Sequence, residues 1–173
     1  DCLIKEQLQP VLEGIEFAYY LIHCMRAKNS DFSDLDRKAA QCFMEVAEEA
    51  GIKKVIYLGG LGETSVRLSR HLQSRMEVGE VLSKSSVPVV RLHAAIIIGT
   101  GSASYELLKS LVMHNRWIPF MVEFNSLCQS IAIRDVIKYL VGIMEVRSSE
   151  SRMYHIGGKE GLSYKDMILG FGR

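Results

Sequence analysis

The sequence lacks any apolar run approaching the roughly 20 residues that a helix needs to cross a bilayer. It also lacks a basic opening stretch followed by a short apolar region and a cleavage site. Neither a membrane span nor a secretory signal is therefore predicted, and we expect a cytoplasmic protein.

An excess of charge of either sign is also missing. Lysine and arginine total 21 and aspartate and glutamate total 20 among 173 residues. Without a net positive field there is nothing to hold nucleic acid or an anionic membrane surface. The expected partner is a small or neutral molecule.

Several chemical motifs are missing as well. The 4 cysteines are widely spaced and include no C-x-x-C pair, so neither a zinc site nor a redox motif is predicted. There is no G-x-S-x-G elbow, no P-loop and no H-E-x-x-H helix. Hydrolase and nucleotidase functions thus lose their main support.

What is present is a repeated alternation of apolar runs and amphipathic stretches. The apolar runs predict strands at 16–22, 54–58, 87–98, 130–133 and 153–156. Periodic stretches predict helices at 33–50 and 69–83, with others beginning near 105, 135 and 164, the last of them capped by Ser163. Leu8, Val11 and Leu12 lie on one face of a further short helix that precedes Gly14. Such alternation predicts an α/β fold, a doubly wound and mostly parallel Rossmann-type sheet with helices on both faces.

Ligands of such sheets bind at the carboxyl ends of the strands. His23 ends the first predicted strand, where it is either close to a ligand or a plain hydrogen-bonding residue. His71 and Arg75 share one helical face, and a permanent cation there favours the neutral imidazole. They are candidates for proton transfer, with a solvated polar helix face as the alternative.

A glycine-rich stretch, residues 99–104, reads GTGSAS between a predicted strand and a predicted helix. It superficially copies a dinucleotide or methyl-donor loop, with Glu123 about twenty residues later. The alternative is a turn followed by a serine that caps the next helix.

Taken together, five blocks in order resemble a known family. They read DRKAAQCFMEVAEEAGIKKVIYLGGLG, LSRHLQSRMEVGEVL, AAIIIGTGSAS, QSIAIRDVIKYLVGIME and YHIGGKEGLSYKDM. They are similar to atypical members of the short-chain dehydrogenase/reductase superfamily, in particular to NmrA-like NAD(P)H-binding proteins and the nucleotide-binding accessory subunit of respiratory complex I. The implied cofactor is NADP or NAD, and the substrate is an unknown small molecule.

The resemblance also implies a set of site residues. In the family the catalytic pair has the form Y-x-x-x-K, and here His71 and Arg75 stand at that spacing. Arg75 is then expected to bind the nicotinamide ribose, and His71 is the candidate proton donor. The other expected cofactor-binding residues follow the predicted strands: Asp1, Cys2, Leu21, Ile22, His23, Leu58, Gly59, Gly60, Ala94 and Ala95.

Relatives carry a Ser or Thr pair where this chain has Gly59 and Gly60, and an arginine where it has His93. Their phosphate-binding G-x-x-G-x-x-G lies on the first strand-helix turn, which has no counterpart here. We therefore expect an internal fragment, residues 1–173 forming a partial NAD(P)-binding domain in which 117–173 contribute to a small substrate-side lobe.

Two functions stay open at this stage. One is hydride transfer between the nicotinamide and a carbonyl or enone. The other is a non-catalytic NAD(P)H-binding redox sensor or assembly factor. A methyl-donor-dependent transferase that uses 99–101 is a third and more distant alternative. A homodimer also stays open, because the helices equivalent to 34–50 and 69–83 pack between subunits in many relatives.

Overall fold

The computed structural model describes residues 1–23, 32–61, 69–114, 127–146 and 150–171. The chain divides into two compact units. The first combines Asp1–His93 with Gly142–His155, and the second combines Ala94–Val141 with Ile156–Arg173. The substrate-side lobe expected over 117–173 stays a prediction, and part of it lies outside the described residues.

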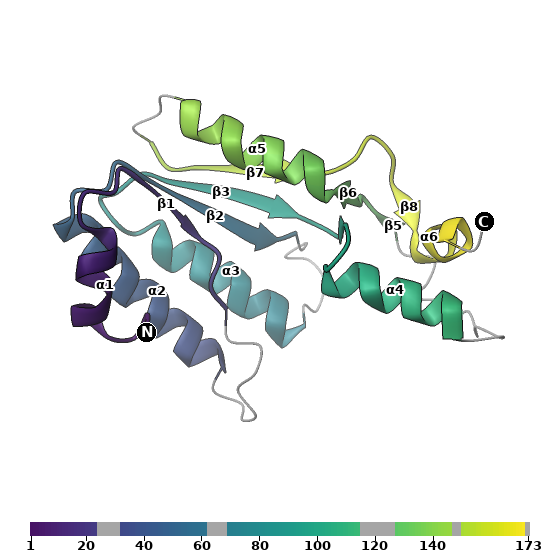
Figure 1. Ribbon diagram of the computed structural model, residues 1–173, viewed down its shortest axis with the longest axis horizontal. Helices are drawn as coiled ribbons and strands as arrows, with labels where there is room; N and C mark the ends of the chain where they lie inside the picture. The colour runs from purple at the N-terminus through teal and green to yellow at the C-terminus, as the bar shows by residue number, and fades with distance from the viewer. Residues whose placement is uncertain (24–31, 62–68, 115–126, 147–149, 172–173) are drawn as a thin grey trace. The chain divides into compact units, whose positions relative to one another are not determined.

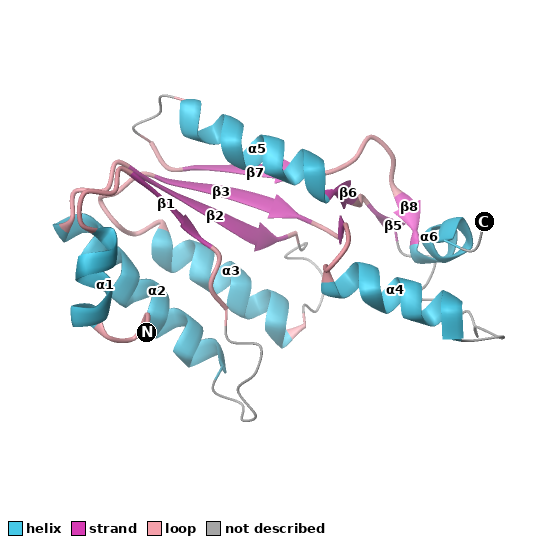
Figure 2. Ribbon diagram, viewed as in Figure 1, coloured by secondary structure: helices cyan, strands magenta, loops and turns pink. Residues whose placement is uncertain are grey.

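The first unit is organised around a four-stranded sheet. Its strands are β1 (Phe17–Tyr20), β2 (Lys54–Gly60), β3 (Val89–Ala94) and β7 (Arg152–Ile156), in the order β1-β2-β3-β7. Strands β1 and β2 are parallel, in a register that runs from Phe17 opposite Lys54 to Tyr20 opposite Tyr57. The arrows of β1, β2 and β3 point the same way in Figure 2. The predicted α/β, mostly parallel sheet is thus confirmed.

One face of this sheet is covered by α1 (Lys5–Leu12), α2 (Phe32–Glu49) and α3 (Arg70–Leu82), as Figure 1 shows. Helix α2 contacts both α1 and α3. It does so because its apolar residues recur on one side of the helix. The buried apolar members of that stripe are Ala39, Ala40, Phe43, Met44, Val46 and Ala47.

Lys54 begins β2 and is buried, with 3% of its surface exposed. Its Nζ donates hydrogen bonds to the carbonyl oxygens of Ile143, at 3.1 Å, and of Val146. These residues lie at the C-terminal end of α5 (Ile133–Glu145), where the last carbonyls have no partner within the helix. The buried ammonium therefore caps α5 and also matches the negative end of the helix dipole.

The second unit holds two short strand pairs. β4 (Ile97–Ile98) runs parallel to β6 (Ile131–Ala132), and β5 (Leu127–Cys128) runs antiparallel to β8 (Leu162–Ser163). Helix α4 (Ala103–His114) contacts α6 (Tyr164–Phe171). As expected, Ser163 caps α6, because its Oγ accepts a hydrogen bond from the Asp166 amide at 3.0 Å.

Three details differ from the sequence prediction. The strand expected at 87–98 is broken at 95–96, because β3 belongs to the four-stranded sheet and β4 pairs with β6. An apolar run does not show where a strand changes partners. Strands β5 and β8 were not predicted, since two residues carry no periodicity. Val11, expected to be on the inner face of its helix, is 64% exposed.

Candidate functional site

The candidate site is built on the first turns of α3. Ser69 caps this helix, its Oγ accepting a hydrogen bond from the Leu72 amide at 3.3 Å. His71 lies in the first turn and Arg75 follows one turn later, so both project from the same side of the helix. His71 is exposed and Arg75 is half-buried.

Arg75 ties α3 to the carboxyl end of β2. Its Nη2 donates a hydrogen bond to the carbonyl oxygen of Leu58, and its guanidinium carbon lies 5.7 Å from the centre of the Tyr57 ring. The Tyr57 hydroxyl in turn donates to the carbonyl oxygen of Arg75 at 2.7 Å. A guanidinium has five N–H donors, so Arg75 keeps donors for a ligand beyond the one used on Leu58.

His71 also meets the residue that follows β1. The ring centres of His23 and His71 lie 6.1 Å apart, with 58° between the ring planes. Burial lowers the pKa of His71, and the positive charges of Arg75 and then His23 lower it further, while Asp36 acts in the opposite direction. His71 is therefore mainly neutral at pH 7, with one nitrogen that donates and one that accepts a proton. The structure thus brings His23, His71, Arg75 and Leu58 together.

The glycines at the end of β2 have a packing reason. A Cβ on Gly59 would lie 3.0 Å from Cε1 of Tyr57 and 3.1 Å from Cδ2 of His93, and a Cβ on Gly60 would lie 2.6 Å from Cδ1 of Leu72. Side chains from β2, β3 and α3 therefore fill the space beside this backbone. Whether Gly59 and Gly60 also contact a cofactor stays a prediction.

His93 is buried at the end of β3, with 7% of its surface exposed. Its ring stacks on that of His155 in β7, with 5.7 Å between centres and 12° between planes. Burial, which is the largest cause, and the charges of Arg91, His155 and Arg75 together lower the pKa of His93 to about 4. His93 is thus a neutral imidazole that packs between strands.

Of the other expected cofactor-binding residues, Leu21, Ile22 and His23 follow β1 and are exposed. That exposure suits a ligand at the carboxyl edge of the sheet. Cys2, by contrast, packs against the apolar core, as does Cys42 of α2. Asp1 binds locally, its carboxylate accepting from the Leu3 amide at 2.9 Å.

Ala94 ends β3 and Ala95 follows it, and both belong to the second compact unit. Ala94 is 2% exposed, so its side chain is part of the packed interior. Contact of either alanine with a cofactor stays a prediction.

Residues 99–104 form a turn followed by a serine that caps the next helix, which is the second of the two alternatives considered for this stretch. Gly101 has a φ of +85°, and a Cβ on Gly99 would lie 2.4 Å from Cγ2 of Ile133. The Oγ of Ser102 accepts from the Tyr105 amide at 3.0 Å and donates to the Ile97 carbonyl at 2.8 Å. The glycines are thus explained by a turn and by close packing, and a serine caps α4. Glu123 lies outside the described residues.

Sequence reasoning missed Asp36 and Tyr57. Asp36 lies on α2 with 4% of its surface exposed, and Tyr57 lies on β2 with 1% exposed. A signal for Asp36 was present in the sequence, because it continues the inner stripe of α2 that also contains Ala39 and Phe43. Tyr57 carried no such signal, since its hydroxyl bond depends on where α3 packs.

The ranges that the structure describes contain no group of three or more His, Cys, Asp or Glu side chains arranged to hold a metal ion. Among those same ranges, no helix combines the length and the apolar character needed to cross a bilayer.

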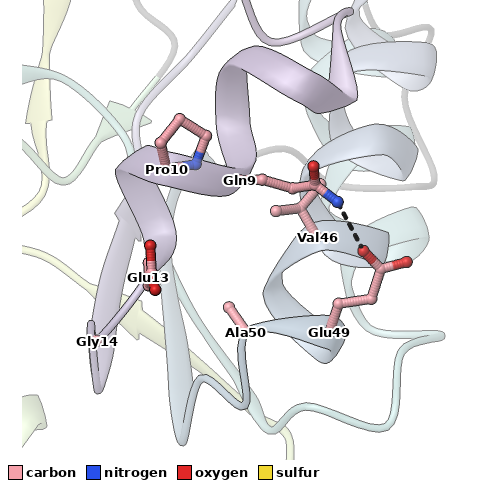
Figure 3. A pocket seen from close by; sticks show the side chains of 7 residues that line it. All are labelled: Gln9, Pro10, Glu13, Gly14, Val46, Glu49 and Ala50. Carbon is pink, nitrogen blue, oxygen red and sulfur yellow. Dashed lines mark hydrogen bonds between the residues drawn. The ribbon is translucent and has the colours of Figure 1, made fainter.

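An open hollow lies between α1 and α2, lined by Gln9, Pro10, Glu13, Gly14, Val46, Glu49 and Ala50 (Figure 3). None of the expected site residues lines it.

No protein-family model and no curated protein sequence matches the chain. Solved structures do match it in fold. UDP-N-acetylglucosamine 4-epimerase from Bacillus cereus superposes with a TM-score of 0.77 at 14% identity, over 98% of this chain and 66% of that one. UDP-glucuronic acid 4-epimerase from Bacillus cereus, in complex with NAD, gives 0.77 at 20% identity, over 98% and 61%.

The Bordetella bronchiseptica enzyme WbmG, in complex with NAD, gives a TM-score of 0.76 at 11% identity, over 99% of this chain and 60% of that one. This chain therefore shares the fold of these enzymes, two of which are solved in complex with NAD, and the expected Rossmann-type α/β fold is confirmed. It spans less than two thirds of the length of these neighbours.

Proposed function

We propose that this chain belongs to an NAD(P)H-binding protein of the short-chain dehydrogenase/reductase type and forms its nicotinamide-side site. The observation that carries the proposal is the pairing of a neutral His71 with Arg75, held at the carboxyl end of β2 by the Leu58 carbonyl. Ligands of parallel sheets bind at that edge. The solved neighbours that contain NAD support the same cofactor.

The described residues fit such a group in three respects. Leu21 and Ile22 offer exposed apolar contacts after β1. Arg75 retains donors for ribose hydroxyls. His71 lies at the same edge, where its imidazolium form would hydrogen-bond a substrate carbonyl oxygen and give it a proton, leaving the neutral imidazole that prevails at pH 7. The bound nicotinamide would supply the hydride for reduction of a carbonyl or enone.

The experiment is a thermal-shift and calorimetric titration of the full-length protein with NADH, NADPH and S-adenosylmethionine. We expect stabilisation by a nicotinamide dinucleotide. A response to S-adenosylmethionine alone would contradict the proposal. Arg75→Lys should weaken dinucleotide binding, because an ammonium cannot bridge Leu58 and a ribose with a planar fork. Arg70→Lys is the matched control, as Arg70 is an exposed residue of the same helix.

Turnover needs its own assay, and the neighbours suggest where to begin. The two Bacillus cereus enzymes are named for UDP-N-acetylglucosamine and UDP-glucuronic acid. These two sugar nucleotides are therefore the first substrates to test, followed by simple carbonyls and enones. His71→Ala should abolish turnover of any substrate found while leaving cofactor affinity intact. Unchanged turnover would remove His71 from the role of proton donor.

The second candidate is an NAD(P)H-binding redox sensor or assembly factor without catalysis. It is favoured by Gly59 and Gly60, which supply no hydroxyl where relatives carry a Ser or Thr pair, and by the side chains of Tyr57 and His93, which fill the space beside Gly59. Dinucleotide binding without turnover of any substrate in the panel is the result that selects this candidate.

A further inference from the structure

A buried polar pair joins α2 to α3. The Ser74 hydroxyl donates a hydrogen bond to Oδ2 of Asp36 at 2.9 Å, and both residues are almost fully buried, with 1% and 4% of their surfaces exposed. Removing a carboxylate from water is costly unless hydrogen bonds and nearby charges compensate. Apolar residues fill the other inner positions of α2, so packing alone does not require an aspartate here.

Ser74 has a particular place on α3. It follows His71 by three residues and immediately precedes Arg75. On a helix with 3.6 residues per turn, a bond that fixes the direction of Ser74 also fixes the directions of His71 and Arg75. A small rotation of α3 about its axis would carry both side chains away from the end of β2, where Arg75 now binds the Leu58 carbonyl.

Asp36 also supplies a negative charge that acts on His71. His71 is affected by Arg75 from its own helix and by His23 from the end of β1, and both disfavour its protonation. The Asp36 carboxylate acts on His71 from α2 in the opposite direction. The charge of Asp36 also raises the pKa of Tyr57 on β2, while those of Arg75 and Arg91 lower it. A proton that His71 accepts is therefore stabilised by Asp36.

Resting on the function proposed above, we propose that Asp36 is a positioning residue of the His71–Arg75 site. Its carboxylate fixes the rotation of α3 through Ser74 and places a negative charge that offsets Arg75 beside His71. Two separable effects follow, one of charge and one of geometry, and conservative variants separate them.

The charge effect is measured by NMR titration of the histidine rings, without any cofactor. The chain has 5 histidines, and His71 is assigned as the signal that His71→Gln removes. Asp36→Asn keeps an acceptor for Ser74 and loses the charge, so the pKa of His71 should fall further. Asp34→Asn is the matched control, because Asp34 is an exposed carboxylate of the same helix that pairs with Arg37 and Lys38. It should leave the His71 titration at the wild-type position.

The geometric effect is measured by cofactor binding. Ser74→Ala keeps the Asp36 charge and removes the hydrogen bond, so dinucleotide affinity should fall while the His71 titration moves less than in Asp36→Asn.

A His71 pKa that is the same in Asp36→Asn and Asp34→Asn would overturn the proposal. Circular dichroism confirms that each variant is folded. If the wild-type protein binds no nicotinamide dinucleotide, the proposed function fails, whereas the NMR result still decides the role of Asp36.

Discussion

The Tyr57 hydroxyl donates a hydrogen bond to the Arg75 carbonyl oxygen at 2.7 Å, across the interface between β2 and α3. The same tyrosine ring lies 5.7 Å from the Arg75 guanidinium carbon, so one buried side chain contacts both the backbone and the side chain of Arg75. Burial raises the pKa of Tyr57, and the phenol stays protonated as a donor. The helix that carries the candidate site is thus held from inside the core.

Tyr57→Phe should lower the free energy of unfolding by about 1 kcal/mol, because it leaves the Arg75 carbonyl without this buried donor. Urea denaturation monitored by circular dichroism is the measurement. Tyr139→Phe is the control, since Tyr139 is 48% exposed and its change should stay within about 0.5 kcal/mol. Equal effects of the two substitutions would mean that the Tyr57 bond contributes nothing specific.

Gly59→Ala and Gly60→Ala should differ. A Cβ on Gly59 meets the ring of Tyr57, which is held against α3, and the ring of His93, which stacks on His155, and it should cost about 1–3 kcal/mol. A Cβ on Gly60 meets only the end of the Leu72 side chain, which can rotate away, so this variant should lose less. The same denaturation experiment compares them, and a larger loss for Gly60→Ala would contradict the packing explanation.

Lys54→Met should destabilise the protein by about 2–3 kcal/mol, since the carbonyls of Ile143 and Val146 lose a charged donor in a buried place. The matched control is Lys53→Met. Lys53 precedes it in the chain and pairs with Glu16 at the surface, where an ion pair contributes little. Thermal unfolding of both variants tests the difference, which should vanish if Lys54 does not cap α5.

Stability should fall as the solution is acidified, with His93 as one cause. Its pKa is about 4 when folded and about 6.5 when unfolded, so the unfolded chain takes up the proton first as the pH falls. The loss begins near pH 6.5, continues to about pH 4, and should reach about 2 kcal/mol between pH 7 and pH 4.5. His71 acts in the same direction, since its pKa is also lowered.

His93→Phe removes this titration while keeping a buried ring, so it should lose less stability than the wild type over that pH range. Urea denaturation at several pH values is the measurement. An acid response of His93→Phe equal to that of the wild type would rule out His93 as a source.

The sequence by itself determined the order and type of the long elements. Apolar runs of strand length and the stripe on α2 follow from local periodicity, which is why β1, β2, α2 and α3 lie close to where they were expected. His71 and Arg75 were paired in the same way, since residues four apart share a helical face. The serine caps at Ser69 and Ser163 are likewise local, because each bonds an amide three residues later.

Only the tertiary structure decided what these residues touch. The Asp36–Ser74 bond joins residues 38 positions apart, the Arg75–Leu58 bond spans 17 positions, and the His93–His155 stack joins β3 to β7. The breaking of the expected strand at 87–98 is of the same kind. Each depends on how helices pack against the sheet and which strands become neighbours, and these arrangements arise from burial of the whole core, which no local pattern contains.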